Sequence, residues 1–251
     1  MDDRFSAWFS ALEARHRATL SFQEIRRALQ ALSSLYVERR ERLAAGSVFD
    51  GAGKRAAFAL YYGPLHFLLL REIVRCLGAA ARPPVRLLDL GCGTGAAGAA
   101  WAMECPAPPL VAAVDQEGWA IAETRWTLAR FGLRGRVQRA NLSFTPLPAP
   151  PSGILAAFAI NELDDAARQR LLPRFLEAHR NGSQVLIVEP LARRALPWWD
   201  DWANAFIAAA GRADEWRFPA ELPETLALLD KAAGLDHRQL TGRSLWLAGA
   251  R

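Results

Sequence analysis

The sequence predicts an α/β fold, in which a mostly parallel, doubly wound sheet of seven strands follows an N-terminal helical extension. Short apolar runs alternate with longer helical stretches from residue 85 onward, as in parallel strands joined by helices. Gly91, Gly93 and Gly95 directly follow the run Val85–Leu90 and precede an alanine-rich stretch. This order of strand, glycine loop and helix forms the nucleotide-type site of doubly wound sheets. Two last runs, 237–241 and 244–248, predict a closing hairpin.

Composition favours a soluble protein with a large core. The chain has 251 residues, of which 51% are hydrophobic, enough for one large domain or a domain with an extension. We expect residues 1–80 to form the extension and a helix that covers the cofactor, and residues 81–251 to form the sheet domain. No uninterrupted apolar run reaches about 18 residues, so we expect no membrane span. Cys76, Cys92 and Cys105 match no metal-binding spacing, which predicts no metal site and favours the reducing cytoplasm.

The N-terminal extension is expected to hold two amphipathic helices. Asp2 or Asp3 can cap the first, whose apolar face is Phe5, Trp8, Phe9 and Leu12. Ser21 and Glu24 have the spacing of a capping box, which starts a second helix. Gly46 is a plausible stop for this helix.

The opposite face of the second helix is basic. Its arginines are Arg26, Arg27, Arg39, Arg40 and Arg42, and residues 1–80 hold twelve Lys or Arg against eight Asp or Glu. This segment therefore carries +4 of the chain's net charge of +5. Two interpretations stay open: a solvated helix face, or a phosphate-binding surface for RNA or a ribosomal particle. The sequence does not indicate the oligomeric state.

The remaining elements follow in order. Phe58–Phe67 is interrupted by Gly63 and Pro64, and Pro64 is expected to start a new helix. After the strand Val85–Leu90, further strands are expected at 110–114, 136–140, 153–160 and 184–188, besides the closing hairpin. Helices are expected at 96–104, 119–130, 164–181 and 222–233, and around Trp198, Trp202 and Phe206.

The acid before the glycine loop distinguishes between two cofactors. Residues 93–98 match the dinucleotide fingerprint Gly-x-Gly-x-x-Gly. However, Asp89 lies two residues before the first glycine, where a carboxylate would repel a pyrophosphate and suit a sulfonium and an ammonium group. Asp89, Gly91, Gly93 and Gly95 fill the motif Asp/Glu-x-Gly-x-Gly-x-Gly. The chain here resembles the class I S-adenosylmethionine-dependent methyltransferases.

This resemblance implies a methyltransferase sheet with a reversed last strand and a set of cofactor-binding residues. Asp115, twenty positions after Gly95, would accept hydrogen bonds from the ribose hydroxyls, and Gln116 would flank the adenine. Asn141 stands where many relatives have an acid. The expected cofactor-binding residues are Tyr62, Asp89, Gly91, Cys92, Gly93, Gly95, Asp115, Gln116, Asn141, Leu142 and Asn161.

Three segments are candidates for the acceptor site, and no catalytic residue is assigned. They supply Tyr61 and His66, then Glu162, and finally Arg193, Trp198 and Trp199. Arginines beside aromatic residues suit stacked bases, although Tyr61 and Tyr62 are equally compatible with core packing, and core packing is the favoured interpretation for His66. A packed helix is the alternative for the segment that contains Trp198. Glu162 is the one polar group we nominate for orienting or deprotonating a nucleophile.

A narrower resemblance rests on Tyr61–His66, the glycine motif, Asn161–Leu163 and Val188–Pro190. Together they look like the methyltransferase-like family associated with small-ribosomal-subunit assembly, although the cysteine cluster of some members is absent. The predicted function is therefore methyl transfer to RNA, particularly ribosomal RNA, or to a ribosome-associated substrate. The alternatives are a non-catalytic RNA-binding assembly factor of the same fold and a nicotinamide-linked oxidoreductase.

Overall fold

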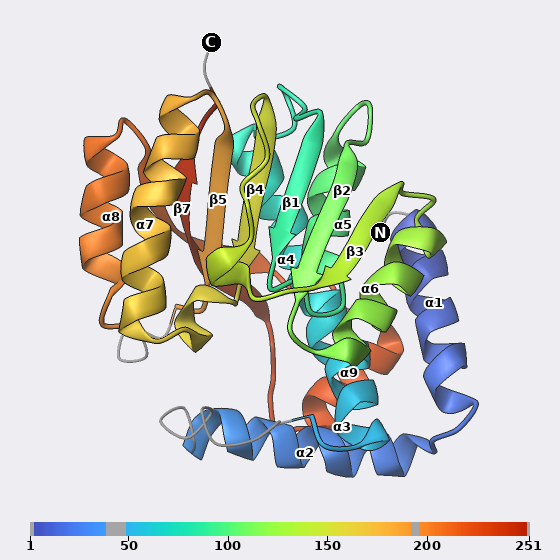
Figure 1. Ribbon diagram of the computed structural model, residues 1–251. Coiled ribbons are helices and arrows are strands. Elements are labelled where there is room, and N and C mark those ends of the chain that lie inside the picture. The colour runs from blue at the N-terminus through green and yellow to red at the C-terminus, as the bar shows by residue number, and fades with distance from the viewer. Residues whose placement is uncertain (1–2, 39–48, 192–195, 250–251) are drawn as a thin grey trace. The chain divides into compact units, whose positions relative to one another are not determined.

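The structure is a computed structural model that describes residues 3–38, 49–191 and 196–249. The chain divides into two compact units (Figure 1). The helical unit comprises residues 1–65 and 219–240, and the sheet unit comprises residues 66–218 and 241–251. No helix in the described part of the chain is both long and apolar enough to span a membrane.

The helical unit is built from amphipathic helices. They are α1 (Asp3–Arg17), α2 (Phe22–Glu38), α3 (Ala52–Ala57), the π-helical turn η2 (Phe58–Tyr62) and α9 (Glu224–Ala232). The predicted capping box is confirmed, because the Ser21 backbone N–H donates to Glu24 Oε2 at 2.8 Å and the Glu24 N–H donates to Ser21 Oγ at 3.3 Å. Of the predicted basic residues, Arg39, Arg40 and Arg42 lie outside the described residues, as does Gly46.

Pro64 lies in the first turn of a new helix, as predicted, but the chain does not leave the helical conformation at Gly63. Residues from Ala52 to Leu77 are helical throughout, since η2 runs directly into α4 (Gly63–Leu77). Proline has no N–H to donate to the preceding turn and normally interrupts a helix. Here one π turn accommodates it, and the Gly63 N–H donates to the Phe58 carbonyl five residues back.

The sheet has seven strands in the order β3-β2-β1-β4-β5-β7-β6. Their bounds are β1 (Arg86–Leu90), β2 (Leu110–Asp115), β3 (Gly135–Arg139), β4 (Ser152–Ala157), β5 (Gln184–Glu189), β6 (Arg212–Pro219) and β7 (Gln239–Leu247). The first five pair in parallel, whereas β7 runs antiparallel to β5, with Ile187 opposite Leu245. The predicted doubly wound sheet with a reversed last strand is confirmed.

Three details of the strand prediction need correction. Strand β4 ends at Ala157 instead of Ile160, because Phe158 turns the chain with φ +57°. The expected hairpin is one strand, β7, and Gly242 lies within it, where a Cβ would approach Leu69 Cδ2 to 3.0 Å. The seventh strand is β6, which the sequence did not reveal because its alternation is mostly between charged and aromatic residues.

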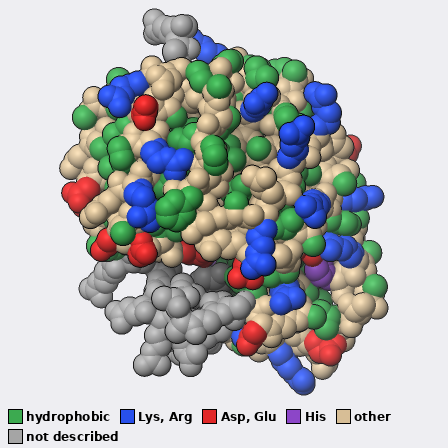
Figure 2. Space-filling view, viewed as in Figure 1, with side chains coloured by type: hydrophobic (Ala, Val, Ile, Leu, Met, Phe, Trp, Pro, Cys, Tyr) green, Lys and Arg blue, Asp and Glu red, His purple; other side chains and the backbone are tan. Residues whose placement is uncertain are grey.

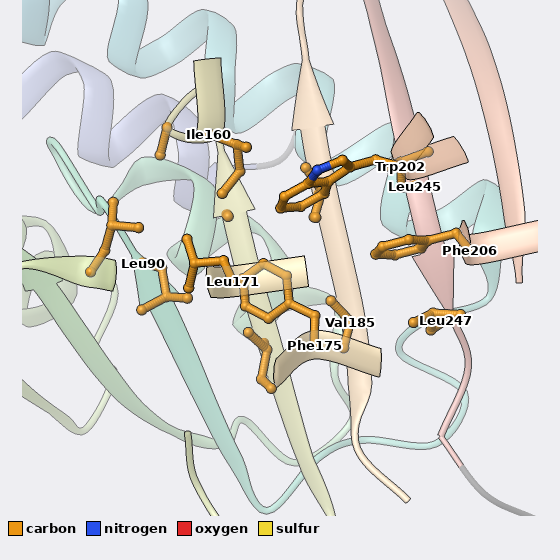
Figure 3. Close-up of a cluster of buried hydrophobic side chains, with 14 of the residues drawn as sticks. Leu90, Ile160, Leu171, Phe175, Val185, Trp202, Phe206, Leu245 and Leu247 are labelled. Carbon is orange, nitrogen blue, oxygen red and sulfur yellow. The ribbon is translucent and has the colours of Figure 1, made fainter. Parts of the chain in front are cut away.

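Helices cover both faces of the sheet (Figure 1). One face carries α7 (Asp165–Arg180) and α8 (Trp199–Ala208), and α4 and α5 (Ala96–Glu104) lie behind the sheet in this view. Figure 3 shows Leu171 and Phe175 of α7, with Trp202 and Phe206 of α8, packed against strand residues that include Leu90. This apolar layer fixes the strands whose carboxyl ends carry the site.

The connection from β3 to β4 contains no α-helix. Helix α6 (Gly118–Arg130) joins β2 to β3, but residues 140–151 form only the short 3-10 helix η3 (Leu142–Phe144) and a proline-rich extended segment. Strand β3 is an edge strand of the sheet, and an extended segment connects it to β4.

Candidate functional site

The glycine loop turns sharply at the carboxyl end of β1. Gly91, Gly93 and Gly95 have φ values of +70°, +53° and +73°, a region that other residues enter at a cost. The N–H groups of Gly91 and Cys92 both donate to the Val114 carbonyl of β2, at 2.9 and 3.0 Å. The loop is thereby held against β2 and leads directly into α5.

Two of these glycines are also required by close packing. A Cβ on Gly91 would lie 2.7 Å from Ala159 Cβ, and one on Gly95 would lie 2.8 Å from Thr124 Cγ2. The Thr124 hydroxyl donates to the Gly93 carbonyl at 3.0 Å. The loop therefore contacts both the segment after β4 and helix α6, and its shape is fixed before any ligand binds.

Asp115 connects the second strand to the loop. Its Oδ2 accepts the Gly93 N–H and its Oδ1 accepts the Glu117 N–H, each at 2.9 Å. The side chain remains partly exposed, and each carboxylate oxygen has a further lone pair. Asp115 is thus positioned beside the glycine loop, as predicted, and also helps to hold it.

The structure corrects the role expected of Asp89. Its side chain is 1% exposed and lies against α5, where a Cβ on Gly98 would be 2.5 Å from Asp89 Oδ2. Burial raises the pKa of Asp89 to about 7, the Gly98 N–H acts in the opposite direction, and the charge of Asp115 raises it further. Asp89 is therefore buried beneath the site and does not present a carboxylate to a ligand.

Cys92 lies in the loop as a small buried side chain. It is 6% exposed, and the Thr124 hydroxyl donates to its Sγ at 3.2 Å. Burial raises the pKa of the Cys92 thiol, and the negative charge of Asp89 adds to this effect. The thiol is therefore neutral and packs in the loop, and its contact with the cofactor stays a prediction. The described residues contain no group of three His, Cys, Asp or Glu side chains that could hold a metal ion.

The predicted adenine residues follow the second and third strands, Gln116 after β2 and Asn141 and Leu142 after β3. The Asn141 side-chain oxygen accepts the Ser143 N–H at 2.9 Å and caps η3, while Gln116 is exposed. Leu142 is buried, and its Cδ2 would lie 3.3 Å from a Cβ on Gly91. These residues surround the glycine loop, and their contacts with adenine stay a prediction.

Asn161 and Glu162 follow β4, as the sequence indicated. They lie in the 3-10 turn η4 (Ile160–Glu162). Desolvation raises the pKa of Glu162 to about 7, and the charge of Asp115 adds to the shift. The Glu162 side chain is itself exposed, so water screens this effect.

Several predicted substrate residues are instead buried. Tyr61 is 0% exposed, and its hydroxyl donates to Asp230 Oδ1 at 2.5 Å. Trp198 and Trp199 are 8% and 6% exposed and belong to the apolar cluster around α7 and α8. Their assignment to substrate is therefore wrong, and the core interpretation is correct. Arg193 lies outside the described residues.

The other two aromatic candidates differ from each other. His66 stacks on Phe158, with ring centroids 4.0 Å apart, and burial lowers the pKa of His66 to about 3. It is therefore neutral and cannot exchange a proton near pH 7. Tyr62 is half-buried in the helical unit, and its contact with the cofactor stays a prediction.

Sequence reasoning missed two residues near this edge. Phe158 adopts a left-handed conformation that residues other than glycine rarely take. Glu189 ends β5, and its Oε1 accepts the N–H groups of Ile160 and Asn161 at 2.9 and 3.1 Å. The available signal was an acid directly after the apolar run Val185–Val188.

Comparison with known proteins identifies the fold only. No protein-family model and no curated protein matches the chain. Among solved structures, a putative O-methyltransferase from Nostoc punctiforme is 12% identical, with a TM-score of 0.57 over 87% of this chain and 72% of that one. An O-methyltransferase family protein from Burkholderia thailandensis is 13% identical, with a TM-score of 0.54 over 84% of this chain and 63% of that one.

A third similar structure is the mitomycin 7-O-methyltransferase. It is 16% identical, with a TM-score of 0.53, and the alignment covers all of this chain and 74% of that one. At these identities the likeness concerns the backbone arrangement. The chain thus has the fold of class I S-adenosylmethionine-dependent methyltransferases.

Proposed function

We propose that this protein is a methyltransferase that uses S-adenosylmethionine. The observation that carries the proposal is the left-handed glycine loop joined to Asp115 through the Gly93 N–H at 2.9 Å. This pair lies at the carboxyl edge of a doubly wound sheet, where such folds bind ligands. The similarity in fold to O-methyltransferases supports the same class.

The side chains at this edge fit a cationic cofactor. Asp115 ends β2, where a carboxylate suits the ribose hydroxyls of either cofactor. The exposed carboxyl of Glu162, which interacts electrostatically with Asp115, would repel the pyrophosphate of a dinucleotide. Ribose hydroxyls, and an ammonium group, are suitable hydrogen-bond partners for these two carboxyl groups. The Glu162 carboxyl group therefore favours S-adenosylmethionine over NAD.

The residues of the chain would act mainly by positioning. S-adenosylmethionine, when bound, supplies an electrophilic methyl group. The glycine loop would hold it against backbone atoms, Asp115 would orient the ribose, and Asn141 would contact the adenine. Glu162, an exposed carboxyl whose pKa is raised by desolvation and by the charge of Asp115, suits the orientation or deprotonation of an acceptor. Such positioning is the largest contribution that a protein makes to a transfer of this kind.

We further propose RNA, in particular ribosomal RNA, as the acceptor or partner. Residues 124–161 contain five arginines and no acidic residue. All five are exposed, and they lie on α6, on edge strand β3 or between them: Arg125, Arg130, Arg134, Arg136 and Arg139. Figure 2 shows Lys and Arg side chains gathered over the region that Figure 1 labels β2 and β3.

This arginine edge is partly ordered by the fold. Arg125 Nη2 donates to the Val137 carbonyl at 2.9 Å, and Arg139 Nε donates to the Gln116 carbonyl at 2.6 Å. Their remaining N–H donors can bind phosphate. Arg26 and Arg27 of α2 are also exposed. The N-terminal helices therefore stay a second predicted contact with RNA.

Two alternative functions can be distinguished from RNA methylation by experiment. A non-catalytic RNA-binding assembly factor would bind RNA without transferring a methyl group. A small-molecule acceptor is suggested by the name of the mitomycin 7-O-methyltransferase, which has a similar fold. In that case the arginines would protect the sheet edge against aggregation.

The experiment is a transfer assay with labelled S-adenosylmethionine over pools of ribosomal RNA, protein and small molecules. Replacing Arg134, Arg136 and Arg139 by Ala should lower RNA binding and reduce the slope of log K against log salt by about 2, since each phosphate contact on single strands contributes about 0.7. The matched control replaces the exposed Arg180, Arg217 and Arg238. Equal effects of both triple variants would refute the arginine edge as the RNA surface.

A further inference from the structure

The turn after β4 is held in an unusual backbone conformation. Phe158 has φ +57°, and its N–H donates to the Val188 carbonyl of β5 at 2.8 Å. This conformation reverses the chain, so that Ala159 lies against Gly91 of the glycine loop. A strained residue at such a point persists only where its surroundings hold it.

Glu189 is the side chain that holds this turn. Its Oε1 accepts the N–H groups of Ile160 and Asn161, at 2.9 and 3.1 Å, and its side chain is fully buried. Its Oε2 is also buried and has no hydrogen-bond partner among the described residues. A buried carboxyl group with one oxygen unsatisfied is costly, and an apolar residue would pack here at a lower cost.

The charges around Glu189 oppose one another. Burial raises the pKa of Glu189 to about 8, and the charge of Glu162 raises it further, whereas the two N–H donors and Arg168 lower it. Arg168 itself donates to the Ile160 and Leu163 carbonyls of the same turn. Arg243, opposite Glu189 on β7, donates instead to the Leu191 carbonyl and to Glu215.

We propose that Glu189 is a positioning residue that fixes the backbone of Ile160 and Asn161, and thereby places Asn161 and Glu162 at the carboxyl edge of β4. Glu189 contacts no solvent and acts only through this turn. The inference rests on the proposed function, because Asn161 and Glu162 are the residues that we assign to the cofactor and the acceptor. The contact itself can be tested without any ligand.

The first test measures amide hydrogen exchange of residues 158–163 in the wild type, Glu189→Gln and Glu189→Leu. Glutamine keeps an oxygen acceptor, so E189Q should retain the wild-type protection of this turn. E189L removes the acceptor and should raise exchange at Ile160 and Asn161 about tenfold or more. Unchanged exchange in E189L would overturn the proposal.

A matched control is Gln184→Leu at the other end of β5. Gln184 is buried, and its Nε2 donates to the Arg82 carbonyl at 2.7 Å. Q184L should lower overall stability without changing exchange of residues 158–163 selectively. If Q184L raised exchange of this turn as much as E189L, the effect would be general loosening and the positioning role would be refuted.

The second test compares folded proteins over pH and does not depend on E189L folding. Burial in the closed state favours the protonated carboxyl of Glu189, so an opening that exposes this side chain to water becomes easier as the pH rises. Protection of the Ile160 and Asn161 amides, corrected for intrinsic exchange, should therefore fall from about pH 5 to about pH 8. E189Q should show no such fall. The same profile in both proteins would overturn the assignment.

Ligand binding separates this inference from the proposed function. S-adenosylhomocysteine should bind wild type and E189Q alike and bind E189L at least about tenfold more weakly, because Asn161 is misplaced. If the wild type did not bind it while exchange responded as expected, the cofactor assignment would fail and the positioning contact would stand. Weaker binding by E189L with unchanged exchange would refute the positioning role.

Discussion

Replacing Asp115 by Ala should weaken both cofactor binding and the glycine loop. The carboxylate accepts the Gly93 and Glu117 N–H groups at 2.9 Å each, and bonds to charged acceptors contribute about 1.5–3 kcal/mol apiece. Because the side chain is partly exposed, water can replace part of this, and we expect a loss of about 1–3 kcal/mol in the free energy of unfolding.

The same variant should lose the ribose contacts. Two hydrogen bonds to a charged acceptor correspond to about 1–3 kcal/mol, or roughly 5- to 150-fold in the dissociation constant of S-adenosylhomocysteine. Calorimetric titration measures the affinity, and thermal unfolding measures the stability. Asp115→Asn keeps one acceptor oxygen and should lie between wild type and Asp115→Ala. Unchanged affinity together with unchanged stability in Asp115→Ala would refute the assignment of this carboxylate.

Three further predictions concern stability. Gly91→Ala should cost about 2–4 kcal/mol in urea unfolding, because its Cβ would meet Ala159 at 2.7 Å in a left-handed conformation; a neutral effect would contradict this packing. Tyr61→Phe should cost about 1–3 kcal/mol, since the buried Asp230 loses a donor; wild-type stability would show that this hydrogen bond contributes nothing. Burial raises the pKa of Asp89 to about 7 and of Glu189 to about 8, so these two carboxyls bind more protons in the folded state. They outweigh the single proton that His66 loses on folding, because burial lowers its pKa. The free energy of unfolding should therefore fall from about pH 5 to about pH 8, and a rise over this range would show that other groups dominate.

The parallel part of the sheet could be predicted because its signals are local. Val85–Leu90 is an uninterrupted apolar run, and the glycines after it have the positive φ values that the loop requires. Asp115 could be placed because the carboxyl ends of neighbouring parallel strands meet at one edge. These inferences need only the order of residues along the chain.

The errors occur where tertiary contacts decide the outcome. Gly242 was predicted to lie in a turn, but it lies inside β7, where it packs closely against Leu69. Tyr61, Trp198 and Trp199 were candidates for the acceptor site, with core packing as the alternative for Tyr61 and a packed helix for the Trp198 segment. Their burial depends on segments that are distant in sequence. Asp89 was expected to face a ligand, but the side chain points from β1 towards Gly98 of α5, a direction that the motif alone does not specify.

Glu189 shows the same limit for functional residues. Its carboxyl group meets Ile160 and Asn161, which are 29 and 28 residues away along the chain. The pairing of β4 with β5 brings them together, so no local pattern could have revealed the contact. Residues that act through another segment require the structure for their identification.

The most direct test of the central claim is calorimetric titration of the intact protein with S-adenosylmethionine, S-adenosylhomocysteine and NAD. The account predicts saturable binding of both sulfur compounds at one site and no measurable binding of NAD, because the exposed carboxyl of Glu162 would oppose a pyrophosphate. Binding of NAD, with no heat from either sulfur compound, would contradict the methyltransferase assignment.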